Sequence, residues 1–212
     1  MRRRWPSPSL RATILNCTLK KSPEKSNGEA LAQVVVEALA EHDVETEIIR
    51  LVDLEIPFGV ESDMGDGDEW PAVREKILAS EILIFAVPTW IGQPSAVAKL
   101  AIERMDAFIS ETDEDDRPVA YNRVAGVVNV GNEDGAHHVI MEVNGALNDI
   151  GYTIAPQSFT YWNMGPGPGP QYVETDHGHD YAESTAKTMA QNLVSVAKAL
   201  EANPLGPPPS DD

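Results

Sequence analysis

Short apolar runs alternate with amphipathic stretches along most of the chain. The run Ile82–Val87 is apolar throughout, which is typical of a strand that is covered on both faces of a parallel sheet. Four other runs, rich in β-branched or aromatic residues, also have the length of strands. The five predicted strands are residues 12–17, 44–51, 82–87, 124–130 and 152–155.

Amphipathic stretches between and after these strands predict five helices. Ser26-Asn27-Gly28-Glu29 fits a capping box before the first helix, and Pro71 suits the first turn of the second. The apolar positions at helical spacing run from Leu31 to Leu39, Trp70 to Ile77, Val97 to Phe108, Val139 to Leu147 and Ala186 to Leu200. The alternation predicts an α/β fold with a doubly wound, five-stranded parallel sheet and helices on both faces. Ligands of such sheets bind beyond the carboxyl ends of the strands, where the strand order reverses.

The length of 212 residues favours one domain, which we expect over residues 11–202. Residues 1–10 and 203–212 lack periodicity and carry few apolar groups. They are predicted to be disordered tails, the second of them rich in proline and acidic residues.

Composition and charge exclude several classes of protein. Hydrophobic residues make up 42% of the chain, enough to fill a core, so general disorder is excluded. The net charge of −18 opposes binding to nucleic acid and to anionic membrane surfaces. The longest uncharged stretch, residues 150–173, is interrupted by proline and glycine and cannot form a spanning helix. A single cysteine, Cys17, excludes a disulfide framework and fits a reducing compartment, so we expect a cytoplasmic protein.

The loop after the first predicted strand combines hydroxyl groups with three lysines, Lys20, Lys21 and Lys25. It leads to a helix N-terminus, and positive charge beside free helix N–H groups suits a phosphate. A solvated loop with a helix cap is the alternative. No G-x-G-x-x-G or G-x-x-x-x-G-K-[ST] motif is present, which excludes those modes of dinucleotide and nucleoside triphosphate binding. Pro23 stands six residues after Cys17, where a thiolate phosphatase needs arginine. These absences leave a pocket for one terminal phosphate.

Two further loops follow the third and fourth strands. The first, Pro88–Ser95, contains glycine, proline and Trp90, so it can offer backbone N–H groups and a flat apolar face to a planar ring. The second, Gly131–Gly135, has two glycines that allow a ligand to approach the backbone closely.

With these three loops, the chain resembles the flavodoxin-like NAD(P)H-dependent FMN reductases, including the multimeric flavodoxin-type quinone reductases, over Arg11–Leu200. The most specific part is Val87–Ser95, followed by Lys99. The first loop is longer than the family's and has Gly28 where a hydroxyl residue is common. The resemblance implies a flavodoxin-like fold that binds FMN, with the phosphate in the first loop and the isoalloxazine ring between the other two. The cofactor-binding residues implied are Thr18, Lys20, Ser26, Asn27, Pro88, Thr89, Trp90, Ile91, Gly92, Asn132 and Gly135. No catalytic acid or base is expected, because the flavin itself carries the hydride.

The resemblance further implies an enzyme that transfers hydride from NADPH or NADH through FMN to a quinone or another small acceptor. An FMN-containing electron carrier that docks on basic partners through its acidic surface is an alternative, and a fold that has lost flavin is a third. The family also implies a homodimer or homotetramer. The aromatic segment 151–173 is expected to contribute Tyr161 and Trp162 to the interface or to a position over the ring.

Other candidate residues are assigned structural roles. Two groups of residues contain the residue types that bind metals, but no metal site is predicted at either. They are Asp134 with His137 and His138, and the segment 174–180 with His177 and His179. Contact of His137 or His138 with flavin or substrate stays open. Cys17 is predicted to be buried. The acidic stretches 61–69 and 111–116 are predicted to be solvated loops.

Overall fold

The computed structural model of the protein describes residues 9–167 and 169–209. Five long strands form one sheet in the order β2-β1-β3-β5-β6, and each neighbouring pair in this order is parallel. The predicted five-stranded parallel sheet is therefore confirmed. The strands are β1 (Arg11–Asn16), β2 (Glu45–Arg50), β3 (Ile82–Trp90), β5 (Val124–Gly131) and β6 (Thr153–Asn163), and the two-residue β4 (Gln93–Pro94) pairs antiparallel with the end of β3.

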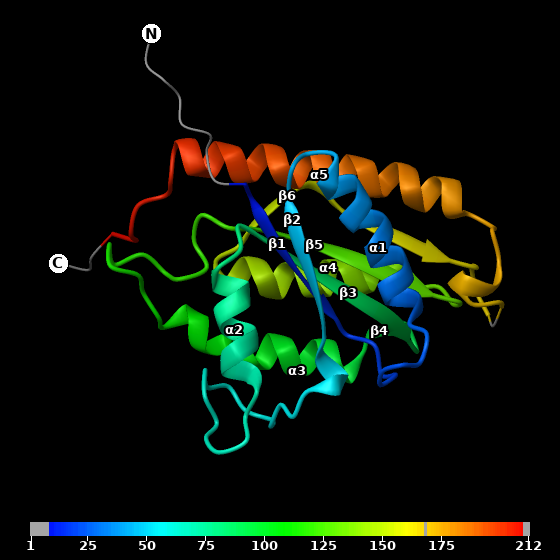
Figure 1. Ribbon diagram of the computed structural model, residues 1–212, viewed down its shortest axis with the longest axis horizontal. Helices are drawn as coiled ribbons and strands as arrows, with labels where there is room; N and C mark the ends of the chain where they lie inside the picture. The colour runs from blue at the N-terminus through cyan, green and yellow to red at the C-terminus, as the bar shows by residue number, and fades with distance from the viewer. Residues whose placement is uncertain (1–8, 168, 210–212) are drawn as a thin grey trace, which may run out of the picture.

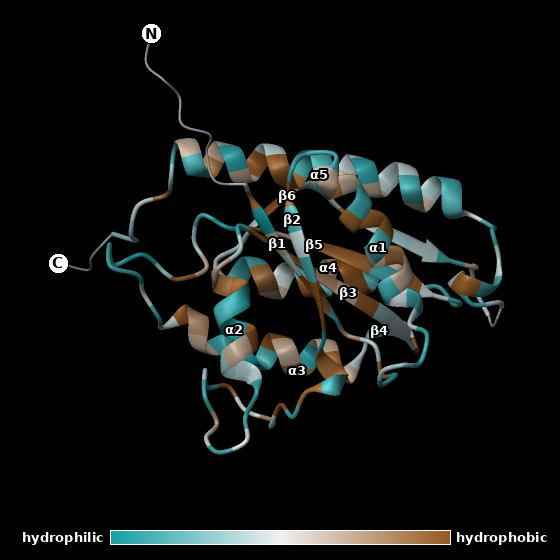
Figure 2. Ribbon diagram, in the orientation of Figure 1, coloured by the Kyte–Doolittle hydropathy of each residue, from teal (hydrophilic) through white to brown (hydrophobic). Residues whose placement is uncertain are grey.

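Helices cover both faces of the sheet, as expected for a doubly wound fold (Figure 1). One core lies between the sheet and helices α1 (Asn27–Ala40) and α5 (His179–Ala202). The second core lies under α2 (Trp70–Leu78), α3 (Ala96–Arg104) and α4 (Ala136–Ile150). Figure 2 shows the hydrophobic residues concentrated on the central strands β3 and β5, between the two helix layers. The strand order reverses between β1 and β3, which is the switch point where ligands of this fold class bind.

Three element boundaries differ from the expectation. The third helix ends at Arg104, and Phe108 lies in a following 3-10 helix, Asp106–Ile109, although it is buried as its spacing suggested. Strand β3 continues to Trp90, because the residues after Val87 form a hairpin with β4. Strand β6 continues well beyond Ala155.

The extension of β6 depends on an irregularity in its pairing with β5. The register shifts after Ala125, so that Ala125 pairs with Ile154 and Val127 with Phe159. The extra residues of β6 crowd against Gly126, where a Cβ would clash with the carbonyl oxygen of Ser158. Only glycine fits there, and beyond the irregularity β6 pairs with β5 again as far as Asn163.

The first acidic stretch is not simply solvated. Asp68 forms an ion pair with Arg104 at 2.6 Å, and both side chains are completely buried. Arg104 also donates to the backbone carbonyls of Pro57 and Glu61, so it fastens the loop between β2 and α2 to the core. Burial raises the pKa of Asp68, but hydrogen bonds from Arg104 and from the backbone N–H groups of Met64 and Trp70 outweigh it and hold that pKa below its usual range. The expectation of a solvated loop was wrong for Asp68.

The predicted tails fall partly outside the described residues, which exclude 1–8 and 210–212. Residues 203–209 form neither helix nor strand. Within them, Leu205 exchanges two hydrogen bonds with the side chain of Asn122. Among the helices that the structure describes, none combines the length and the apolar composition needed to cross a bilayer.

Candidate functional site

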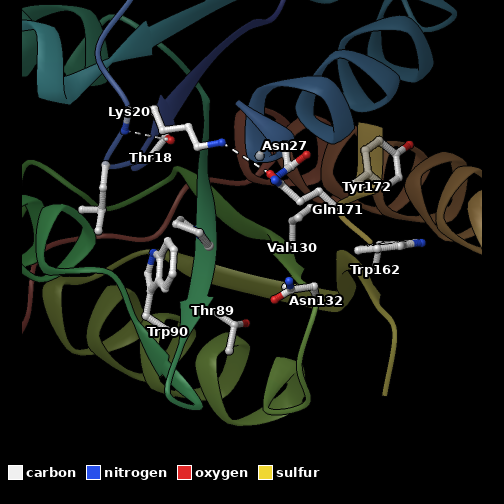
Figure 3. Close-up of a pocket in the computed structure, with 14 residues that line it drawn as sticks. Thr18, Lys20, Asn27, Thr89, Trp90, Val130, Asn132, Trp162, Gln171 and Tyr172 are labelled. Atoms are coloured by element: carbon white, nitrogen blue, oxygen red, sulfur yellow. Dashed lines mark hydrogen bonds between the residues drawn. The ribbon is translucent and has the colours of Figure 1, made fainter. Parts of the chain in front are cut away.

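A cleft with a volume of about 220 Å³ lies at the carboxyl end of the sheet. It lies at the switch point between β1 and β3, and it is lined by the carboxyl ends of β3, β5 and β6 and by residues that follow β1, β5 and β6 (Figure 3). The lining residues are Thr18, Leu19, Lys20, Asn27, Gly28, Pro88, Thr89, Trp90, Val130, Gly131, Asn132, Trp162, Gln171 and Tyr172.

The cleft brings together most of the residues expected to bind the cofactor. From the three loops come Thr18, Lys20, Asn27, Pro88, Thr89, Trp90 and Asn132.

Four expected residues do not line the cleft. Ser26 is buried, and its Oγ accepts a hydrogen bond from Glu29 N as the cap of α1. Ile91 and Gly92 form the tip of the β3–β4 hairpin, both with positive φ, and the side chain of Ile91 is 90% exposed. Gly135 packs against the backbone of Gly92. These four residues shape the loops rather than the cleft surface.

The first loop carries hydrogen-bond donors at the start of α1. Ser26 caps the N–H of Glu29, and among the described residues no partner is found for the N–H groups of Asn27 and Gly28. Lys20 adds a positive charge, and the hydroxyl of Thr18, which is almost completely buried, adds a further polar group. Free helix N–H groups beside an ammonium are the donors that a phosphate requires.

Arg50, at the end of β2, braces this loop from behind and was missed in the sequence. One guanidinium nitrogen donates to the carbonyl oxygens of Lys20, at 3.3 Å, and Glu24, at 2.9 Å. The others bind the carboxylate of Glu29 in the first turn of α1, at 3.1 and 2.5 Å. Arg50 therefore holds the loop to the helix that it precedes.

Two more contacts fix the first loop. Ser22 donates through its hydroxyl and its N–H to Asp53, and these hydrogen bonds hold the pKa of that carboxyl below its usual range. Ser95, the buried N-cap of α3, donates to the carbonyl oxygen of Cys17 at 2.7 Å. Cys17 is buried as predicted, and burial raises the pKa of its thiol.

The second and third loops are joined by polar contacts. The buried side chains of Thr89 and Asn129 hydrogen-bond to each other, at 3.0 Å between Oγ1 and Nδ2. The N–H of Ile91 donates to the carboxylate of Glu133 at 2.7 Å. A Cβ at Gly131 would lie 2.8 Å from that of Thr89, so glycine is required where these strand ends converge. The two loops thus form one wall of the cleft.

Aromatic side chains stand on both sides of the cleft. Trp90 lies on one side and is about half exposed, whereas Trp162 and Tyr172 lie on the other and are buried (Figure 3). The indole Nε1 of Trp162 donates to the carbonyl oxygen of His177 at 2.6 Å. Tyr172 belongs to the aromatic segment 151–173, but Gln171 follows a glycine- and proline-rich run that has no motif, so its place in the cleft could not be predicted.

Tyr161 and the histidines lie outside the cleft lining. Because side chains alternate along β6, Tyr161 faces away from Trp162 and contacts His137 and Tyr181. His138 pairs with Glu142, and His179 stacks on Tyr172 with ring centroids 4.0 Å apart. Within the described residues, no group of three or more His, Cys, Asp or Glu side chains could hold a metal ion.

The chain matches the family model of the NADPH-dependent FMN reductases over residues 11–165. A Mycobacterium bovis protein named divalent metal cation transporter MntH is 38% identical over 91% of this chain, but the chain spans only 29% of that protein's length. A Streptomyces davaonensis protein named 8-demethyl-8-aminoriboflavin-5'-phosphate synthase is 32% identical over 92% of this chain and 80% of its own length.

Two solved structures show the same architecture. The crystal structure of RosB with the bound intermediate 8-demethyl-8-formylriboflavin-5'-phosphate has a TM-score of 0.86 and 32% identity, and the match covers 93% of this chain and 82% of that one. A flavodoxin from the domain Archaea has a TM-score of 0.53 at 10% identity, over 87% of this chain and 99% of its own. The second likeness shows the fold alone, which is flavodoxin-like.

Proposed function

This chain belongs to the family of NADPH-dependent FMN reductases, and from that premise we propose that it binds FMN in the cleft and transfers hydride from NADPH or NADH to a quinone or another small acceptor. The observation that carries the proposal is the position of the cleft. It lies at the switch point, with Lys20 and the start of α1 on one side and the apolar face of Trp90 beside them.

The donor set of the cleft fits a phosphorylated flavin. Lys20 and the N–H groups of Asn27 and Gly28 would hold the phosphate, with the hydroxyl of Thr18 beside them. Bound FMN supplies the hydride-accepting ring, and the protein positions it.

In the proposed reaction the residues of the cleft position the ligand, because the flavin itself carries the hydride. Among the described lining residues there is no aspartate, glutamate or histidine. The joined ends of β3 and β5 form a rigid polar wall, in which Asn129 holds Thr89 in place. The half-exposed Trp90 leaves one side of the cleft open to solvent, so a nicotinamide or an acceptor can approach from there.

The test uses the purified protein under anaerobic conditions. We expect it to bind FMN, seen as quenching of flavin fluorescence, and the absorbance of the bound flavin to bleach when NADPH or NADH is added. A protein that does not bind FMN would refute the proposal. A protein that binds FMN but is not bleached by either nicotinamide would be an electron carrier, consistent with its charge of −18.

A second candidate function is chemical modification of the flavin itself. It is favoured by the likeness to the 8-demethyl-8-aminoriboflavin-5'-phosphate synthase, at 32% identity, and to RosB with its bound flavin intermediate, at a TM-score of 0.86. In that case the phosphorylated flavin would be substrate rather than cofactor. Mass spectrometry of the flavin recovered after aerobic incubation distinguishes the two, because a cofactor is recovered unchanged.

We further propose a cytoplasmic homodimer or homotetramer. Exposed apolar side chains support the assembly. Ile91 at the hairpin tip, Met141 on α4 and Tyr181, which contacts Tyr161, are each more than half exposed. Light scattering of the purified protein tests the assembly, and cell fractionation tests the location.

A further inference from the structure

A segment that joins β6 to α5 crosses the mouth of the cleft. This crossing segment, residues 169–178, is fastened on both sides. On one side Asn132 donates to the carbonyl oxygen of Gly169 at 3.1 Å, and on the other the N–H of Val173 donates to Asn27 Oδ1 at 3.3 Å. The two asparagines come from the third and first loops, so the segment spans the cleft from one wall to the other.

The hydrogen bonds fix the orientation of two side-chain amides. Because the N–H of Val173 must meet an oxygen, Asn27 turns Oδ1 toward it and Nδ2 toward Gln171. Gln171 therefore presents its oxygen, Oε1, which lies 2.8 Å from Asn27 Nδ2 and 3.4 Å from Lys20 Nζ (Figure 3). Its Nε2 is directed instead toward Glu174, at 3.5 Å.

Gln171 thus places an acceptor oxygen where donors converge. Lys20 and Asn27 belong to the set that would hold the flavin phosphate, and both already donate to the same oxygen of Gln171. This is the pattern expected when a side-chain oxygen occupies a position that an anion can also take, since converging donors that are partly buried are costly to leave unsatisfied. An amide oxygen carries no net charge, so a phosphate is the stronger acceptor of the two.

We infer that the carboxamide oxygen of Gln171 is an internal competitor for the anion subsite, which the phosphate of FMN must displace. The inference rests on the proposed binding of FMN in this cleft. Gln171 is then a specificity-determining residue. It lowers the affinity for phosphorylated flavin and leaves that for riboflavin unchanged, because riboflavin has no group that enters the subsite.

The test compares FMN and riboflavin binding to flavin-free protein, by fluorescence quenching, for the wild type and two variants. Gln171→Met keeps the length of the side chain but removes the competing oxygen. We expect FMN to bind about three- to tenfold more tightly, the effect of one net hydrogen bond, with riboflavin within about twofold of wild type. Gln171→Glu leaves a charged oxygen beside the subsite and is expected to weaken FMN about tenfold or more, again with little effect on riboflavin.

The matched control is Gln191→Met, the same substitution on the exposed side of α5, which should change neither affinity. If Gln171→Met leaves FMN binding unchanged or weakens it, or tightens both flavins equally, the inference is overturned while the proposed function stands. Wild-type protein that binds neither flavin overturns both.

Discussion

Arg50 offers a direct test of how the first loop is held. Its guanidinium binds two loop carbonyls and the carboxylate of Glu29, and its side chain is 12% exposed. Arg50→Ala removes two hydrogen bonds from a charged donor to the loop, each contributing about 1.5–3 kcal/mol where well formed. Because the bond to Lys20 O is long, at 3.3 Å, we expect a total near the value of one such bond.

The freed loop must be ordered again when FMN binds, so the free energy lost with these hydrogen bonds lowers the affinity for FMN. A loss of about 1.5–3 kcal/mol corresponds to about 10- to 150-fold weaker FMN binding. Glu29 adds to this loss, since its carboxylate keeps the hydrogen bond from Asn16 Nδ2 but has lost its charged partner at the helix end that would hold the phosphate. We therefore expect Arg50→Ala with Glu29→Gln to bind FMN more tightly than Arg50→Ala alone.

The assay is a calorimetric or fluorescence titration of flavin-free protein. Arg50→Lys keeps the charge but loses the fork that reaches both partners, and should fall between wild type and Arg50→Ala. Lys76→Ala serves as the charge control, because Lys76 pairs with Glu47 on the surface, away from the cleft lining, and both are about half exposed. Wild-type affinity in Arg50→Ala, or an equal loss in Lys76→Ala, would refute the bracing role.

Four further predictions rest on the contacts described above. Lys20→Ala should weaken the binding of FMN about tenfold or more and that of riboflavin little. Lys21 is next to Lys20 but outside the cleft lining, so Lys21→Ala should change FMN binding much less. Equal losses for the two flavins in Lys20→Ala would show that Lys20 does not hold the phosphate. Arg104→Met should lower the free energy of unfolding by about 3–5 kcal/mol in urea titrations, because it leaves Asp68 buried without its partner. Because the folded-state pKa of Asp68 is depressed, the contribution of Asp68 to the free energy of unfolding is present above pH about 4 and is lost as the pH falls through that pKa. Asp68→Asn should therefore lose less stability than the wild type on acidification. Gly131→Ala should destabilise the fold by about 1–3 kcal/mol, because the added methyl group meets Thr89, and unchanged thermal stability would contradict that crowding.

The main strands could be predicted because their burial follows from local pattern. The first six residues of β3 are all buried and apolar, and a run of that kind has few alternatives. The length of β6 could not be predicted, because Pro156 interrupts its pattern and the bulge depends on the close approach of Ser158 to Gly126, far away in the sequence. The ends of elements are decided by such tertiary contacts rather than by local preference.

The candidate site was predictable where it is built from loops that follow strands. Lys20, Trp90 and Asn132 line the cleft because the carboxyl ends of parallel strands meet at one edge. Arg50 and Gln171 could not be found in this way. The first looks like an ordinary exposed residue of an edge strand, and the second follows a run without periodicity, so that only its hydrogen bonds to the first loop reveal its position.

The cleft draws its lining from positions as distant in the chain as Thr18 and Tyr172. A ligand bound there contacts early and late parts of the polypeptide at once, so its binding free energy opposes global unfolding and not only local loop motion. At a concentration one hundred times the dissociation constant, this linkage adds about 2.7 kcal/mol to the native state. The lifetime of the protein against proteolysis should consequently rise and fall with the supply of riboflavin to the cell that makes it.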